Sequence, residues 1–471
     1  MRRLWICIGF GLLVAVYTAV IAGRTSMAAG GSDSSGYLNE ARLMTQGRAS
    51  IPLTPLRNLH IGGDWAWVFT PLGFRPSLDS HSIVPTYPPG WPVQLAAAAL
   101  AGGWQRLPFV LAPLSAGVTL LLMFLFALQL GLEEWLAVAA AAILAVSPVF
   151  IMFALQPVTD VVATSWVLAA MVAALASERR AGWAVAAGVA FAVSVCVRPA
   201  DVLLAIPLLF ALKLRPRAIA IAAVSALPIG IALALWQNAL YGSPFRTGYG
   251  DAAPLLSWRN LPTHVPHYAF WLAVLLTPFI FPGGLFIAAD RRAPRTMLLS
   301  WFAVFFVFYC FYGPYETWWY TRFLLPAFPP LIAGFLLLVR RKRAVAAVLI
   351  AVVLAVGVFA SRRFSVLSFG EGESVYPEAV LGSERILPRD AIVISMQMSG
   401  AFLYYSGRLT VRWDNLDNDR FQLLRAYAGA ANLHWYALLA DFELEDMKGR
   451  LKGTWTPIAR FRDVTLYRLD S

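Results

Sequence analysis

The chain is poor in charged residues and in cysteine. Of its 471 residues only 14% are Asp, Glu, Lys or Arg, whereas 59% are hydrophobic. Soluble domains carry about 25% charged residues, so a soluble globular protein is excluded. The three cysteines, Cys7, Cys196 and Cys310, all lie inside apolar runs, which predicts no disulfide framework.

Several motifs of well-known enzyme classes are also missing. There is no HExxH pair for zinc, and no P-loop or GxGxxG precedes a helix. No Gly-x-Ser-x-Gly nucleophile elbow occurs either. The function must therefore be sought in residues placed by a membrane fold.

Long apolar runs take up most of the first 360 residues. A helix needs about 20 apolar residues to cross the bilayer, and we expect about eleven crossings. The predicted spans are 4–22, 106–130, 135–154, 160–177, 182–197, 200–212, 217–240, 268–289, 296–312, 323–339 and 344–360. The alternative for residues 1–29 is a cleaved signal peptide, which the long apolar core disfavours. The shorter run 91–103 is predicted to be a helix at the membrane surface.

The net charge of +12 comes from basic clusters between the apolar runs, which argues against a nucleic-acid partner. These are Arg2-Arg3, Arg179-Arg180, Lys213/Arg215/Arg217, Arg291-Arg292/Arg295 and Arg340-Arg341-Lys342-Arg343. Cytoplasmic loops collect Lys and Arg, and the predicted spans put every cluster on one side. The N-terminus is then cytoplasmic, and the segments outside are 23–105, 155–159, 241–267, 313–322 and 361–471.

The tail, 361–471, is more polar and predicts a separate extracytoplasmic α/β domain. Strands are expected at 391–396, 409–413 and 435–439, a helix at 399–405, and a closing hairpin at 454–460 and 463–469. The fold class is thus an α-helical polytopic membrane domain, 1–360, followed by this domain. The membrane domain includes the long outer loop 23–105.

Two isolated carboxylates stand out at the outer face. Asp33 follows the first span, and Asp160 lies at the mouth between two spans. A carboxylate there can act as a general base or hold a divalent cation. The alternative for both is a helix N-cap, with Ser32 or Asp33 at the first and Thr159 or Asp160 at the second.

Further polar residues gather at the same face. Arg198 could bind a phosphate through its planar donor fork, or it could form an ion pair with Asp201 across the turn. Four other outer residues are candidates for substrate binding: Arg246, His264, His267 and Glu316. The alternative is that they are solvent-exposed loop residues that bind nothing. Arg322 is the first residue of the segment Arg-Phe-Leu-Leu-Pro and is a further candidate for substrate binding.

In their order and topology, these segments resemble the polytopic GT-C glycosyltransferases that use polyprenyl-phosphate sugars. That group contains the protein O-mannosyltransferases and the lipid A aminoarabinose transferase. The matching pieces are Asp33…Tyr37…Ala41…Gly47, Tyr87-Pro88-Pro89-Gly90…Gly103, Ser147-Pro148…Thr159-Asp160, Gly188…Arg198-Pro199, Gly242-Ser243-Pro244-Phe245 and Arg322-Phe323-Leu324-Leu325-Pro326.

The resemblance implies a role for each matching residue. Asp33 would be the base, Asp160 the second acidic residue, and Arg198 and Arg322 the cations near the donor phosphate. The matching Tyr37 and Tyr87 would line the substrate site. Some members have an acidic residue and a Lys before the Pro-Pro, where this chain has Thr86-Tyr87, so phosphate binding by that Lys cannot be carried over. The acidic pair of other branches is also missing, since Asp33 is followed by Ser34-Ser35, and this weakens a metal assignment.

The function implied is sugar transfer in the cell membrane with inversion. The donor would be a polyprenyl-phosphate sugar, the acceptor a glycan, lipid or protein, and a divalent cation could assist. A lipid-linked polysaccharide polymerase or ligase is an alternative. A transporter is a weaker one, because transporter sites lie near the bilayer midplane and the polar residues here gather at one face.

Overall fold

The computed structural model describes residues 2–59, 61, 63–250, 253–285, 294–313 and 316–470. These form two compact units, each built from separate stretches of chain. The helical unit comprises Met1–Thr25, Val110–Ala234 and Asp251–Phe369. The mixed unit comprises Ser26–Phe109, Leu235–Gly250 and Gly370–Ser471. The basic pair Arg291-Arg292 lies outside the described residues.

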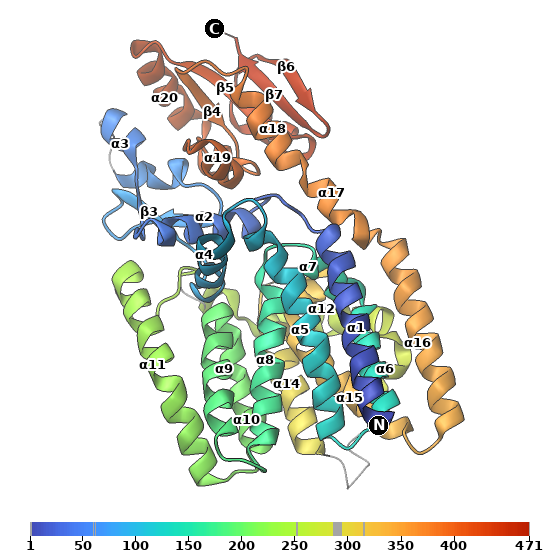
Figure 1. The fold of residues 1–471 in the computed structure, drawn as a ribbon. Helices are drawn as coiled ribbons and strands as arrows, with labels where there is room; N and C mark the ends of the chain where they lie inside the picture. Colours follow the sequence, from blue (N-terminus) through green and yellow to red (C-terminus); the bar gives the residue numbers. More distant parts are fainter. Residues whose placement is uncertain are drawn as a thin grey trace. The chain divides into compact units, whose positions relative to one another are not determined.

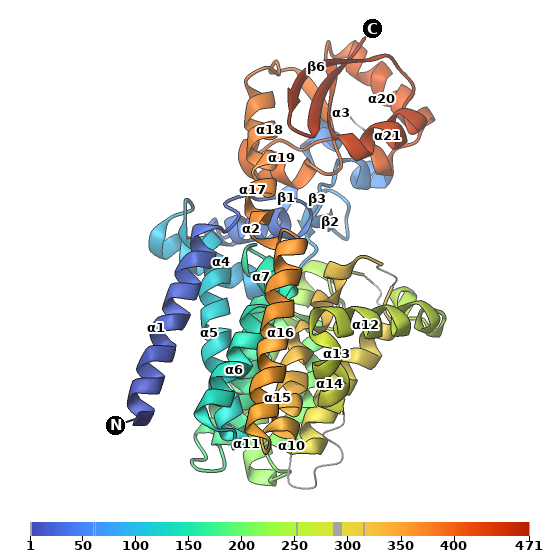
Figure 2. The ribbon, with the colours of Figure 1, turned by 90° about the vertical axis from the view of Figure 1, so that its right-hand side faces the viewer.

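The helical unit is a bundle, and Figures 1 and 2 show its helices side by side. Its helices are α1 (Arg2–Gly23), α5 (Leu107–Gln129), α6 (Glu134–Ala145), α7 (Pro148–Ala154), α8 (Thr159–Ala176), α9 (Trp183–Val197), α10 (Ala205–Ala211), α11 (Pro216–Tyr241), α12 (Leu261–Leu275), α13 (Thr277–Leu285), α14 (Arg295–Phe311), α15 (Phe328–Val339) and α16 (Arg343–Arg363). The 3₁₀ helices η2 (Pro199–Leu204) and η6 (Trp318–Ala327) connect some of them.

Among the described residues, six helices are long and apolar enough to cross a membrane, or up to eight if each bent pair is one span. The pair α6 and α7 is bent by 67°, where Pro148 begins the second helix. The pair α12 and α13 is bent by 119° at Thr277, whose φ is +72°. Three shorter apolar helices cover further predicted spans. The polytopic helical class is confirmed, and the count of eleven spans stays a prediction.

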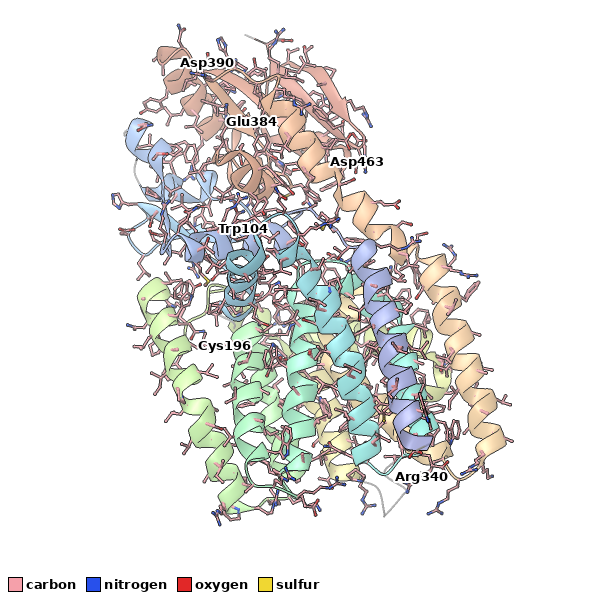
Figure 3. All side chains as sticks on the ribbon, viewed as in Figure 1. Trp104, Cys196, Arg340, Glu384, Asp390 and Asp463 are labelled. Atoms are coloured by element: carbon pink, nitrogen blue, oxygen red, sulfur yellow. The ribbon has the colours of Figure 1, made fainter. Side chains whose placement is uncertain are left out.

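Side chains on two of these helices can be located in Figure 3. Cys196 lies near the end of α9, and Arg340 follows the last residue of α15. Cys196 is half-buried, Cys310 is buried and Cys7 is exposed, and all three thiols are free.

The C-terminal part of the mixed unit contains a four-stranded sheet in the order β4-β5-β7-β6. Its strands are β4 (Ala391–Ile394), β5 (His434–Ala440), β6 (Trp455–Phe461) and β7 (Val464–Leu469). Strands β4 and β5 are parallel, and the other neighbouring pairs are antiparallel. The strands predicted at 391–396 and 435–439 and the closing hairpin are confirmed.

The helices of this part are α17 (Phe369–Glu373), α18 (Val375–Glu384), α19 (Ser399–Ser406), α20 (Asn418–Ala430) and α21 (Leu444–Arg450). Helix α19 ends at Gly407, whose φ of +74° suits glycine, as predicted. The strand expected at 409–413 is wrong. Val411 alone bridges to Ile394, and the next residue, Arg412, donates its backbone N–H to Val68 instead of extending the pairing.

The first outer loop supplies another part of the mixed unit. It forms α2 (Asp33–Thr45), α3 (Thr54–Leu59), η1 (Gly63–Phe69), α4 (Gly90–Gly102) and a small sheet of β1 (Ile51–Pro52), β2 (Phe74–Pro76) and β3 (Ser82–Pro85). Helix α4 confirms the helix predicted at 91–103 and packs against α2. Its position at a membrane surface stays a prediction.

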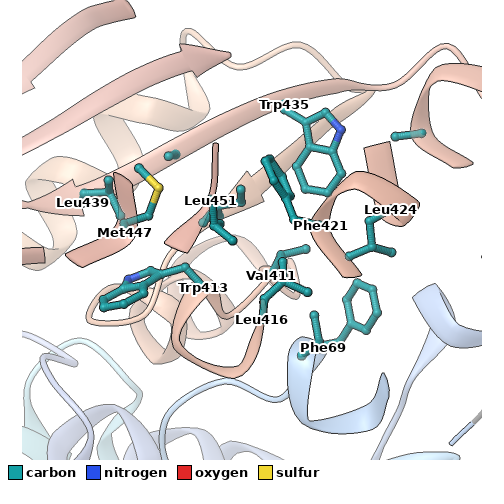
Figure 4. Close-up of a cluster of buried hydrophobic side chains, with 14 of the residues drawn as sticks. Phe69, Val411, Trp413, Leu416, Phe421, Leu424, Trp435, Leu439, Met447 and Leu451 are labelled. Atoms are coloured by element: carbon teal, nitrogen blue, oxygen red, sulfur yellow. The ribbon is translucent and has the colours of Figure 1, made fainter. Parts of the chain in front are cut away.

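The loop and the C-terminal segment share one hydrophobic core. Phe69 from the loop packs with Val411, Trp413, Phe421 and Leu424, all of which are buried. Figure 4 shows Phe69 beside Leu424, with Trp413, Phe421 and Trp435 around the same interior. Burial of a large apolar side chain contributes about 1.5–3 kcal/mol, so this core holds the two segments together.

Candidate active-site residues

Asp33 is the first residue of α2 and is held by a tyrosine from the far end of the loop. The Tyr87 hydroxyl donates to Asp33 Oδ1 over 2.7 Å, and Ser32 Oγ lies 2.7 Å from the same hydroxyl. Since a phenol has one proton, the Ser32 hydroxyl is the donor to Tyr87. Ser32 occupies the N-cap position without a side-chain capping bond. The carboxylate is therefore oriented by Tyr87.

Aromatic rings surround this hydroxyl. The ring centroids of Tyr37 and Tyr87 are 4.5 Å apart at 35°, and Tyr249 meets Tyr87 edge-on at 6.0 Å. Gly36 permits this packing, because a Cβ there would lie 2.4 Å from Tyr87 Cε2. The predicted residues Asp33, Tyr37 and Tyr87 thus come together. Tyr249 was not predicted.

Tyr87 is a neutral donor at this position. Burial raises the pKa of its phenol well above 10.0, and the nearby Asp33 carboxylate raises it further. The residue that stands where some GT-C enzymes have a lysine therefore brings no positive charge. Arg75 is the cation found nearby in the mixed unit: its Nη1 donates to the Gly248 carbonyl over 3.1 Å. Nothing in the sequence pattern around Arg75 pointed to it.

A second carboxyl on α2 is fully enclosed. Glu40 is 1% exposed, and within the described ranges neither carboxyl oxygen has a hydrogen-bond partner. Burial raises the pKa of Glu40 well above 4.5, which favours the protonated carboxyl. The predicted residue Arg246 is in the same unit, in the turn that leads to Thr247 and Gly250, and is exposed.

In the helical unit, Asp160 pairs with two arginines. It lies in the first turn of α8 and is 1% exposed. Arg198 Nη2 lies 2.5 Å from Asp160 Oδ1, and Arg322 Nη1 lies 3.8 Å from Oδ2. Phe153 and Phe323 face the Arg322 guanidinium at 5.1 and 5.4 Å. The structure therefore joins three predicted residues, which we call the Asp160 cluster.

The predicted ion pair between Arg198 and Asp201 is wrong. Arg198 turns its guanidinium to Asp160, and Asp201 donates its backbone N–H to the Arg198 carbonyl. Asp201 is fully buried, and no described residue hydrogen-bonds its carboxyl oxygens. The reason is local: Arg198 has extended backbone and ends α9, which directs its side chain toward α8 and η6.

The histidines lie together on α12. His264 is 1% exposed, and its ring centroid is 6.4 Å from that of His267. Neither ring nitrogen of His264 has a hydrogen-bond partner among the residues described. Glu316 is exposed and close enough to interact electrostatically with both imidazoles.

Across the described ranges, no group of three His, Cys, Asp or Glu side chains is placed to hold a metal ion. Asp33 accepts a bond from Tyr87, and Asp160 is paired with arginine. The divalent cation considered from the sequence stays a prediction.

Comparison with known proteins identifies the fold. No protein-family model and no curated protein matches the chain. ArnT from Cupriavidus metallidurans, in the apo state, is 14% identical over 98% of both chains, with a TM-score of 0.59. The same protein bound to undecaprenyl phosphate is 15% identical over 97% of both chains, with a TM-score of 0.56.

An archaeal protein is similar as well. The oligosaccharyltransferase AglB from Archaeoglobus fulgidus, in complex with an inhibitory peptide and a dolichol-phosphate, is 11% identical. The match covers 100% of this chain and 75% of that one, with a TM-score of 0.57. The GT-C fold predicted from the sequence is therefore confirmed over nearly the whole chain.

Proposed function

We propose that this protein is a membrane glycosyltransferase with Asp33 as its general base. It moves a sugar from a polyprenyl-phosphate donor to a hydroxyl of a glycan, lipid or protein at the extracytoplasmic face. The observation that carries the proposal is the Asp33 carboxylate, held by the Tyr87 hydroxyl at the start of α2. The likeness to a fold solved with undecaprenyl phosphate supports the choice of donor.

The reaction is a single displacement. The acceptor oxygen attacks the anomeric carbon while Asp33 takes the hydroxyl proton. The bond from the anomeric carbon to the phosphate oxygen breaks, and the polyprenyl phosphate leaves with the bonding electrons. Attack opposite the leaving group inverts the anomeric carbon.

For the Asp160 cluster we propose a role in substrate binding within the helical unit. Arg198 is committed to Asp160 over 2.5 Å, whereas Arg322 is 3.8 Å from the same carboxylate. Both guanidinium groups are candidates for binding an anionic group of the substrate. His264, His267 and Glu316 remain candidates for substrate binding at α12.

Sugar transfer by purified protein tests the proposal. Wild type, Asp33→Asn and the control Asp419→Asn, an exposed aspartate on α20, are incubated with a panel of polyprenyl-phosphate sugars. We expect one donor to be consumed by wild type and control, and a loss of about 10²–10⁴-fold in Asp33→Asn. Unchanged turnover in Asp33→Asn, with the protein folded, would remove Asp33 from the role of base.

The likeness to an oligosaccharyltransferase favours a second candidate, transfer of a preassembled lipid-linked glycan. A pyrophosphate-linked glycan donor in the same panel separates the two reactions. Consumption of that donor alone would replace the monosaccharide reaction with the polymerase or ligase reaction. Movement of a sugar across vesicles without any bond cleavage would instead indicate a transporter.

A further inference from the structure

Helix α19 of the C-terminal segment lies directly on α2. The Gly400 carbonyl accepts a hydrogen bond from Asn39 Nδ2 over 2.9 Å, and Asn39 is only 4% exposed. The same turn of α19 binds the neighbouring loop, because the Leu72 backbone N–H donates to Ser399 Oγ over 3.0 Å. Both bonds join segments more than 300 residues apart in the sequence.

Glycine is required where the two helices cross. A Cβ at Gly400 would lie 2.1 Å from Ser35 Oγ and 2.9 Å from Ser35 Cβ, and 3.1 Å from the Leu72 carbonyl oxygen. Distances this short force a shift of one helix against the other. Ser35 is two residues after Asp33, so the shift would occur within the first turn of α2.

Helix α19 also contacts the last turns of α2 and the chain just before α2. The Arg42 guanidinium stacks over the Tyr404 ring, 3.8 Å from its centroid, and donates to the Tyr404 carbonyl. On the other side of Asp33, the Ala29 backbone N–H donates to the Tyr405 hydroxyl over 2.8 Å. The segment that carries Asp33 is thus bound to α19 before, within and after its first turn.

We propose that α19 is a clamp that positions Asp33, and that Ser35, Asn39, Arg42 and Gly400 are its positioning residues. A helix moves as a nearly rigid rod, and contacts from Ser35 to Arg42 extend over about 10 Å of it. They fix both the tilt and the rotation of α2. This role rests on the proposed function, since it concerns the orientation of the candidate base.

Gly400→Ala tests the clamp, with Gly449→Ala in α21 as the matched control, because a Cβ at Gly449 meets nothing within 4 Å. A misplacement of about 1 Å at a reacting group can lower the rate about a hundredfold. We therefore expect Gly400→Ala to lower kcat about ten- to a hundredfold, with KM little changed and the folded fraction equal to wild type. The control should keep the wild-type kcat.

Two further measurements separate positioning from general damage. Ser35→Gly removes the two closest obstacles, so the double variant Gly400→Ala/Ser35→Gly should regain most of the kcat measured for Ser35→Gly alone. Amide hydrogen exchange should quicken in α2 of Gly400→Ala and not in the control. Unchanged exchange in α2, or a loss of kcat that Ser35→Gly does not relieve, would overturn the clamp.

The clamp and the proposed function can fail separately. If wild type consumes no donor while exchange in α2 still quickens in Gly400→Ala alone, the clamp stands and the proposed reaction fails. If wild type transfers sugar and Gly400→Ala leaves both kcat and exchange unchanged, the reaction stands and the clamp fails.

Discussion

Tyr87 binds Asp33 across 54 residues of sequence, hydroxyl to carboxylate, over 2.7 Å. Asp33 begins α2 and Tyr87 lies shortly before α4 in the same outer loop, so the bond brings the two ends of the segment between them together. Tyr87 also replaces the lysine found at this position in some GT-C enzymes. At this position the loop therefore orients its carboxylate with a neutral phenol and not with a cation.

Tyr87→Phe should lower turnover without unfolding the protein. The substitution keeps the ring that packs on Tyr37 and removes the hydroxyl that orients Asp33. We expect kcat to fall about ten- to a hundredfold, less than in Asp33→Asn. Steady-state kinetics on the identified donor measures the effect, and Tyr427→Phe on the exposed side of α20 is the control. Equal kcat in wild type and Tyr87→Phe would show that the bond does not orient the base.

Gly36→Ala should separate Tyr87 from α2. The added Cβ would lie 2.4 Å from the Tyr87 ring and 2.9 Å from Gly73 Cα, and overpacking of this kind costs about 1–3 kcal/mol. We expect a lower unfolding temperature together with reduced turnover. Gly429→Ala, at a glycine with nothing within 4 Å, should change neither quantity. A Gly36→Ala protein as stable as wild type would contradict the close packing.

Arg198→Met should destabilise the helical unit, because it leaves Asp160 buried with a single arginine at 3.8 Å. Removal of one partner of a buried pair costs about 3–5 kcal/mol. Replacing both residues, in Arg198→Met/Asp160→Asn, should recover part of that loss. Arg343→Met breaks an exposed pair with Glu133 and should leave the free energy of unfolding nearly unchanged. The unfolding free energies of wild type and the three variants measure these costs. Equal losses for Arg198→Met and Arg343→Met would refute the assignment of Arg198 and Asp160 as a stabilising buried pair.

Glu40→Gln should make the protein more stable at neutral pH. Burial raises the pKa of Glu40 well above 4.5, so the folded protein keeps a proton that the unfolded chain releases. The free energy of unfolding then falls as pH rises above about 4.5, and glutamine removes this dependence. We expect equal stability near pH 4 and a more stable variant at pH 8. Parallel pH profiles for wild type and Glu40→Gln would show that Glu40 ionises in the folded state; the exposed Glu445→Gln is the control.

Local patterns predicted much of this fold. The apolar runs became the helices of the bundle, and the strands at 391–396 and 435–439 were recognisable because burial and β-branched residues are local signals. The strand at 409–413 failed because its pairing after Val411 was lost to a distant segment. Arg412 donates its N–H to Val68, a partner that no local pattern reveals.

The candidate site residues also divide into those that local patterns revealed and those that local patterns missed. Asp33, Asp160 and Arg198 stood out because polar residues are scarce beside apolar spans. Their partners did not follow from spacing: Arg198 was expected to pair with Asp201, three residues away, and it pairs with Asp160. Arg75 and Tyr249 were missed because neither belongs to a recognisable motif.

The amino-acid sequence was enough to identify a polytopic helical membrane protein with a mixed α/β tail, because the length and polarity of each segment are local properties. The three-dimensional fold was needed to show that Tyr87 meets Asp33 and that two arginines share Asp160. It also decided that α19 covers α2, so that the tail and the first outer loop have a common core. Those contacts depend on the packing of residues that are distant in the chain.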